Sequence, residues 1–155
     1  MKTKEKSVTK ICSFYANKWH LTTMLLPYIS KMIENGYEIE TILEDNIEEN
    51  MKELTERLNI NNNTKKKILD INWTSNKIEE LKSIKNDKRI VLIEGNIQKI
   101  NQANKYIEDN NKNNISIINC FHVTQIEDNI SEILSTHDLI LNTSGNHEIN
   151  KALNP

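Results

Sequence analysis

Short apolar runs alternate along the chain with segments whose apolar residues recur at helical spacing, and this alternation constrains the fold more than any other feature. Continuous apolar runs are typical of strands buried on both faces, and amphipathic segments are typical of the helices that cover them. The pattern therefore predicts an α/β domain with a mostly parallel sheet of about six strands flanked by helices. The predicted strands are 11–15, 37–43, 67–71, 89–93, 115–121 and 139–141.

Predicted helices fill the intervals between these strands. The first begins at about Leu21 and is closed by Gly36, and the others are 47–58, 78–84, 97–107 and 126–134. Pro27 falls inside the first helix, where it removes a backbone hydrogen bond and predicts a kink or two abutting helices. The asparagine runs 61–63 and 110–114 are predicted to be loops.

Length and charge limit the class of protein. A chain of 155 residues fits one domain, here 1–155, with 1–8 expected to be a flexible start and 143–155 a tail. The chain carries 20 basic and 22 acidic residues, and its lysine clusters at 2–10 and 65–67 lack interleaved aromatic residues, so no direct binding of nucleic acid is expected. No apolar run approaches the roughly 20 residues that span a bilayer, and no signal peptide is evident, so a cytoplasmic protein without membrane contact is expected.

The two cysteines lie inside predicted strands. Cys12 and Cys120 are therefore expected to be buried thiols and not a disulfide, with redox sensing by the pair as the alternative. Cys120 and His122 share one face of a strand but lack an evident third group to orient the imidazole. We expect Cys120 to pack in the core and His122 to be more open.

Two kinds of site are not predicted. Only three glycines, Gly36, Gly95 and Gly145, occur in the chain, and no phosphate-binding loop motif can be built from them. Histidines 20, 122, 137 and 147 are dispersed and form no zinc-binding spacing. No metal, no cofactor and no catalytic residue are therefore predicted.

Ligands of open α/β sheets bind outside the carboxyl ends of the strands, and this rule selects the candidate site. Glu94 ends a buried strand just before Gly95, where it could face a ligand or cap the next helix. Aromatic residues that follow strands could line a pocket or be ordinarily part-buried. The candidate ligand-binding residues are Phe14, Tyr15, Trp19, His20, Glu44, Trp73, Glu94 and His122, with Asp45 beside them.

Three segments in order resemble the MEDS sensory family. Residues 11–15 (Ile-Cys-Ser-Phe-Tyr), 25–29 (Leu-Leu-Pro-Tyr-Ile) and Gly36 are similar to its opening strand, its helix and the closing glycine. Further on, the segment from Arg89 to Glu94, residues 106–108 (Tyr-Ile-Glu), residues 115–122 and Thr136-His137 resemble later parts of the family pattern. The resemblance covers roughly residues 8–142 and implies a RecA-like sheet, without a working phosphate loop, that serves as a sensory input.

The chain also departs from the family pattern. Lys10, Asn119, His122 and Asp138 stand where the family often has His, Cys, Asp and Pro, and the segment between 58 and 88 is shorter than is usual in the family. Family members often precede a histidine kinase or a DNA-binding domain, and no output domain is evident within these 155 residues. The resemblance therefore implies that the chain acts through a partner or is an excised fragment.

Three functions remain open. The first is a non-catalytic sensory module that binds a small ligand or nucleotide, or a regulatory protein such as a histidine kinase or transcription factor. The second is a degenerate RecA-like enzyme that processes a nucleotide through Glu94. The third is an interaction protein that forms a homodimer or docks through the helix face of Met24, Leu25, Tyr28 and Met32.

Overall fold

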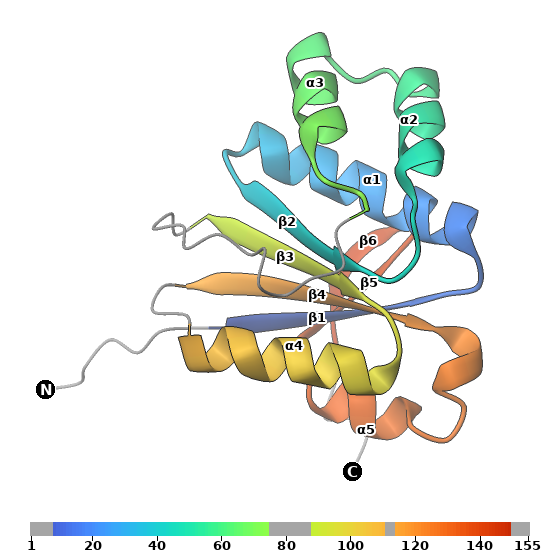
Figure 1. Ribbon diagram of the computed structural model, residues 1–155, viewed down its shortest axis with the longest axis vertical. Coiled ribbons are helices and arrows are strands. Elements are labelled where there is room, and N and C mark those ends of the chain that lie inside the picture. Colours follow the sequence, from blue (N-terminus) through green and yellow to red (C-terminus); the bar gives the residue numbers. More distant parts are fainter. Residues whose placement is uncertain (1–7, 75–87, 111–113, 150–155) are drawn as a thin grey trace, which may run out of the picture.

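A computed structural model describes residues 8–74, 88–110 and 114–149. Six strands of this part of the chain form one sheet in the order β2-β3-β4-β1-β5-β6, and helices lie on both of its faces (Figure 1). The expected α/β class with a mostly parallel sheet is confirmed, and the arrangement is compatible with a RecA-like fold. The strands are β1 (Val8–Tyr15), β2 (Glu38–Leu43), β3 (Arg89–Glu94), β4 (Ile115–His122), β5 (Leu139–Asn142) and β6 (Gly145–Glu148).

The first strand of the chain lies inside the sheet. β1 pairs in parallel with β4 along its whole length and with β5 on its other side. β3 joins β2 to β4, also in parallel, and only β6 runs antiparallel, as the second strand of a hairpin with β5. The carboxyl ends of β1, β2, β3 and β4 therefore lie at one edge of the sheet.

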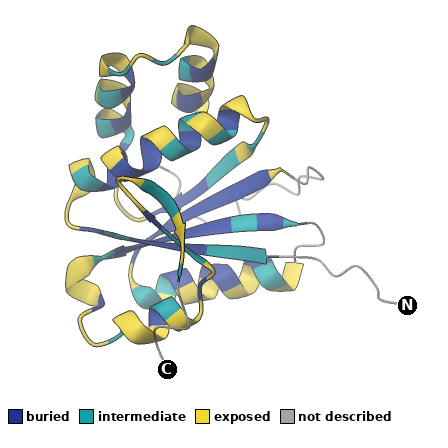
Figure 2. Cartoon of the chain, turned by 180° about the vertical axis from the view of Figure 1, so that it is seen from behind, coloured by how far each residue is buried: buried dark blue, intermediate teal, exposed yellow. Residues whose placement is uncertain are grey.

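The helices are divided between the two faces of the sheet (Figure 1). Three of them, α1 (Lys18–Glu34), α2 (Glu48–Arg57) and α3 (Asn62–Asp70), pack over one face with the cluster that includes Ile11, Leu92 and Ile118. The others, α4 (Ile97–Asn110) and α5 (Ile130–Ser135), cover the opposite face with the cluster that includes Val91, Ile117 and Phe121. Figure 2 shows the result, with buried strands between helices that expose their outer surfaces.

Local signals fix both ends of α1. The side chain of Asn17 accepts a hydrogen bond from the backbone N–H of His20 and caps the amino end. Gly36 has φ +90° just beyond the carboxyl end, a conformation that residues with a Cβ rarely adopt. The helix is continuous through Pro27, so of the two expectations there, two separate helices are excluded.

The prediction of a strand at 67–71 is wrong, because α3 occupies Asn62–Asp70. Asn61 starts this helix by accepting a hydrogen bond from Thr64 N–H at 2.8 Å, so the asparagine run that was expected to be a loop is a helix start. The helix buries only Thr64 and Ile68, which lie four residues apart on one side. A single apolar stripe of this kind suits a helix at the surface and not a buried parallel strand.

The sixth strand lies where a tail was expected. Gly145–Glu148 pairs antiparallel with β5, and Gly145 has φ +112° in the connecting turn. The helix predicted at 126–134 is shorter and begins later, because residues 127–129 form a turn and α5 (Ile130–Ser135) starts after it. A 3₁₀ turn (η2) at Val123–Gln125 precedes this segment. The helix predicted at 78–84 lies outside the described residues.

The helix face proposed for docking is part of the protein core. Met24 is 3% exposed and Leu25 is fully buried, and Tyr28 and Met32 pack against the same cluster. The sheet lies on one side of α1, and α2 and α3 pack against the same helix, so Met24 and Leu25 have no surface to offer a second copy. Docking through this helix face therefore stays a prediction for Tyr28 and Met32 alone, because both keep some exposed surface. Among the helices in the described part of the chain, none has the length and apolar character to cross a lipid bilayer.

Both cysteines are buried and unbridged, as predicted. Cys12 lies in the core under α4 and α5, whereas Cys120 lies in the core under α1, so the two thiols point to opposite faces of the sheet. Burial raises the pKa of the Cys12 thiol to about 12 and also raises that of Cys120. Neither the geometry nor the chemistry of these thiols favours a redox pair.

Candidate functional site

The topology of the sheet offers a place for ligands at the carboxyl ends of β1 and β4. These neighbouring strands lead into helices on opposite faces, α1 after β1 and α5 after β4. Ligands of open α/β sheets bind where the connections diverge in this way. Tyr15 and His122 end the two strands as cross-strand partners. We call this place the β1–β4 corner.

Tyr15 and Glu94 are hydrogen bonded across an intervening strand. The phenol of Tyr15 donates to Glu94 Oε2 at 2.7 Å, and both residues are 3% exposed. The other oxygen, Oε1, accepts from the backbone N–H groups of Glu44 at 3.1 Å and Asp45 at 2.9 Å. Cys120, on the strand between them, lies in register with Glu94. One carboxylate thus joins β1, β3 and the turn after β2.

Burial governs the protonation of this pair. It raises the pKa of Glu94, and the hydrogen bonds from Asp45 N–H and from Tyr15 oppose the rise. The pKa of Tyr15 is raised well above its ordinary value, first by burial and then by the hydrogen bond to Glu94. The phenol therefore stays protonated and acts as a donor to the carboxylate.

Two histidines lie against the end of β1. The ring of His122 packs edge-on against Tyr15, with centroids 5.2 Å apart, and its Nδ1 accepts from Thr124 N–H at 3.2 Å. His20, in the first turn of α1, accepts at its Nδ1 from Ala16 N–H at 2.9 Å. Both side chains are half-buried. The predicted residues Tyr15, His20, Glu94 and His122 are thus brought to the same edge of the sheet.

Three further residues of the predicted site, Trp19, Glu44 and Asp45, have exposed side chains. Trp19 is 45% exposed in the first turn of α1. Glu44 and Asp45 are exposed, and an added Cβ at Gly95 would stand 3.2 Å from Glu44 Oε1, so the Glu44 side chain lies over that glycine. Of these three residues, only Glu44 and Asp45 bind Glu94, and they do so through their backbone N–H groups.

Two predicted residues lie elsewhere. Phe14 contacts Phe121, with ring centroids 6.0 Å apart, in the core on the face opposite to Tyr15. Trp73 is 1% exposed, and its indole N–H donates to the carbonyl of Ile68 at 2.9 Å. It anchors the end of α3 in the core and lines no open surface.

The backbone between β1 and α1 uses its N–H groups internally. The side chain of His20 accepts a hydrogen bond from the N–H of Ala16. Asn17 Oδ1 accepts from the N–H of His20 at 2.9 Å, and the Asn17 carbonyl accepts from the N–H of Leu21 at 2.9 Å. A phosphate cradle needs such groups to point at the ligand. Here side chains of the same turn occupy two of them.

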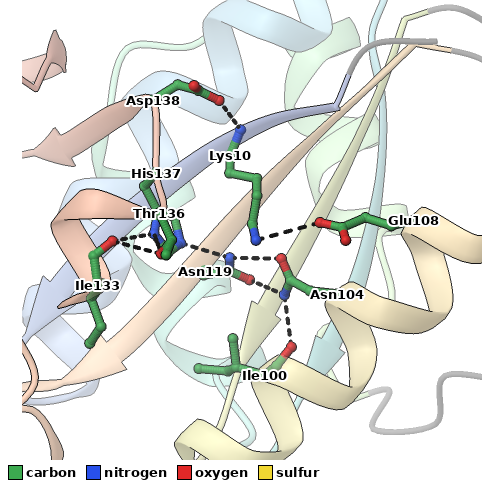
Figure 3. A network of polar contacts seen from close by, with 9 residues as sticks. All are labelled: Lys10, Ile100, Asn104, Glu108, Asn119, Ile133, Thr136, His137 and Asp138. Atoms are coloured by element: carbon green, nitrogen blue, oxygen red, sulfur yellow. Dashed lines mark hydrogen bonds and ion pairs between the residues drawn. The ribbon is translucent and has the colours of Figure 1, made fainter. Parts of the chain in front are cut away.

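A buried polar network on the opposite face was not predicted (Figure 3). Asn104 and Asn119 exchange two amide hydrogen bonds, at 2.8 and 3.1 Å, and Asn119 Nδ2 lies 3.0 Å from His137 Nε2. His137 Nδ1 lies 2.7 Å from the carbonyl of Ile133. The network ties α4 and α5 to β4, and the one signal for it is a polar Asn119 within an apolar strand.

Comparisons with protein-family models, with curated proteins and with solved structures give no match to this chain.

Proposed function

We propose that this chain is a non-catalytic sensory module that binds a small ligand at the β1–β4 corner and passes its state to a regulatory partner such as a histidine kinase or a transcription regulator. The resemblance to the MEDS family supports the proposal. The observation that supports it most is that the Glu94 carboxylate accepts three hydrogen bonds from the protein itself, one from Tyr15 and two from the turn after β2.

The hydrogen bonds of Glu94 bear on whether the residue could act as a catalytic base. A carboxylate at the end of β3 would be the natural general base of an enzyme built on such a sheet. Its two oxygens instead accept from three donors of the protein itself. A base must reach the proton that it removes, so a carboxylate held in this way is better suited to hold segments together.

The same bonds give a route for a signal. A ligand that moves Tyr15 or His122 acts on Glu94, and Glu94 holds the N–H groups of Glu44 and Asp45 at the start of the connection to α2. α2 packs on α1 with much of its outer surface exposed (Figure 2). We therefore expect a regulatory partner to contact α2 and the turn that follows β2.

Ligand binding is tested by thermal unfolding in the presence of nucleotides, cyclic dinucleotides and small metabolites. A compound at 100 times its dissociation constant adds about 2.7 kcal/mol of stability. Trp19→Ala should weaken the response, whereas Leu69→Ala should not, because Leu69 is similarly exposed but belongs to α3. A screen without any response, together with no partner retained from lysate, would contradict the proposal.

Catalysis is tested separately by turnover of ATP and GTP. We expect none above a buffer control, in the wild-type protein or in Glu94→Gln. Turnover by the wild-type protein that disappears in Glu94→Gln would instead establish the nucleotide-processing enzyme.

A further inference from the structure

The ring nitrogens of His20 and His122 are not equivalent, because the backbone fixes which one can carry the proton. Ala16 N–H donates to Nδ1 of His20, and Thr124 N–H donates to Nδ1 of His122. The Thr124 hydroxyl lies 2.7 Å from the same His122 nitrogen. A nitrogen that accepts from an N–H group cannot itself bear hydrogen, so in the neutral ring the proton lies on Nε2.

Each histidine therefore presents an Nε2–H donor. Among the described residues, no hydrogen-bond partner is found for Nε2 of either ring, and both side chains are half-buried. The two histidines contact consecutive residues of the chain. His122 is the cross-strand partner of Tyr15, and His20 accepts a hydrogen bond from the backbone N–H of Ala16. Two fixed donors thus stand at the β1–β4 corner, where the topology places a ligand.

We propose that His20 and His122 bind an oxyanion group, phosphate or carboxylate, of a small-molecule ligand through their Nε2–H donors. This inference rests on the proposed function and names the chemistry of its ligand. Lys18, exposed in the first turn of α1, adds a positive charge to the helix end that also carries His20. The oxygens of Glu94, the nearest buried carboxylate, are turned to Tyr15 and to backbone N–H groups, so they do not compete for the histidine donors.

The same tautomer argues against a transition metal at this corner. A metal-binding histidine coordinates through one unprotonated nitrogen and usually donates from the other. Here Nδ1 accepts and Nε2 carries the proton, which is the reverse of what coordination through Nε2 needs. The pair is therefore arranged to donate and not to coordinate.

The test uses inorganic phosphate and malonate as two separate probes, at an ionic strength held constant with KCl. Nitrogen-15 spectra of the histidine side chains report the tautomer, and thermal unfolding reports binding. We expect both rings to carry hydrogen on Nε2, and at least one probe to give a saturable rise in the melting temperature. A response to phosphate alone, or to malonate alone, identifies which oxyanion the corner accepts.

Asparagine is the matched substitution at both positions, because its side-chain oxygen can replace Nδ1 as an acceptor while the Nε2–H donor is lost. His20→Asn and His122→Asn should each weaken binding about ten- to hundredfold, as expected for one hydrogen bond to a charged group. His147→Asn, at an exposed histidine of β6, should leave binding unchanged.

Five results would overturn the inference. The first four are no saturable response to either probe, a response that both asparagine variants retain, protons on Nδ1, and Zn²⁺ binding that both variants abolish. A neutral metabolite that stabilises the protein, with the response lost in both variants, would also overturn it. That last result would leave the sensory module intact, so the two proposals can fail separately.

Discussion

Tyr15 and Glu94 stand on strands that are not neighbours, and their side chains meet at 2.7 Å across the end of β4. The contact is long-range in sequence and buried, so removing the donor leaves a carboxylate oxygen without a partner inside the protein. A bond to a charged group of this kind contributes about 1.5–3 kcal/mol. This relationship gives the first of five predictions.

Tyr15→Phe should lower the free energy of unfolding by about 2 kcal/mol, because the ring still packs but Glu94 Oε2 loses its donor. Urea unfolding at neutral pH measures the change. Tyr106→Phe is the control, since Tyr106 is 43% exposed and its phenol should contribute little. Equal stability of Tyr15→Phe and the wild-type protein would show that the hydrogen bond contributes nothing.

The raised pKa of Glu94 predicts a pH dependence of stability. Because burial lifts its folded pKa above the ordinary value of 4.5, the folded state holds the proton more tightly than the unfolded state does. The stability linked to this proton is complete below pH 4.5 and is lost as pH rises through the folded pKa. Glu94→Gln should therefore gain stability relative to the wild-type protein as pH rises above 4.5. Parallel urea unfolding curves of the two proteins at successive pH values test it, and a constant difference would contradict it.

Thr55 has a buried hydroxyl with no hydrogen-bond partner among the described residues. Thr55→Val keeps the shape of the side chain and removes that hydroxyl, so it should raise the free energy of unfolding by about 1 kcal/mol. Thr22→Val is the matched control, because Thr22 is equally buried in a helix but its hydroxyl donates to the Lys18 carbonyl at 2.8 Å. Chemical unfolding should show a gain for Thr55→Val only.

The Asn104–Asn119 pair predicts strong coupling between two substitutions. Asn119→Leu leaves the buried Asn104 amide without its reciprocal partner and should cost about 2–3 kcal/mol. Asn104→Leu combined with Asn119→Leu should cost less than the sum of the two single changes, because no amide of the pair is then left unmatched. A double-mutant cycle by urea unfolding measures the coupling, and strictly additive costs would contradict it.

The two tryptophans should differ in fluorescence. Trp73 is 1% exposed and Trp19 is 45% exposed. Trp19→Phe should therefore leave a blue-shifted emission that acrylamide quenches weakly. Trp73→Phe should leave a red-shifted emission that is quenched strongly. Similar quenching in the two variants would be incompatible with a buried Trp73.

Most of the sheet was predictable from the sequence because its parallel strands are buried on both faces. β3 is the clearest case, since all six of its residues are buried and the apolar run from Ile90 to Ile93 has no surface alternation. The segment 67–71 was wrongly predicted to be a strand because Ile68, Leu69 and Ile71 also form a short apolar group. The cap that decides its helical state, at Asn61, lies six residues earlier. β6 was missed because its residues are polar, and only the glycine in its turn hinted at a hairpin.

Part of the candidate site was also predictable. Strand ends alone placed Tyr15, Glu94 and His122 at one edge, but the bond between Tyr15 and Glu94 depends on the strand order, which no local pattern contains. Phe14 and Tyr15 could not both have belonged to the site, because adjacent residues of a strand point to opposite faces. Trp73 was misplaced together with the strand that it was thought to follow.

The place of β1 inside the sheet has a consequence for how the chain matures. Its partners, β4 and β5, lie in the last third of the sequence. While a ribosome is still making those residues, the first strand has no neighbour to bind, and its apolar residues remain open to aggregation or to chaperones. The β1–β4 corner therefore forms only after residues 115–122 have been made, so a partner that recognises it also recognises a chain in which every residue from β1 to β4 has been synthesised.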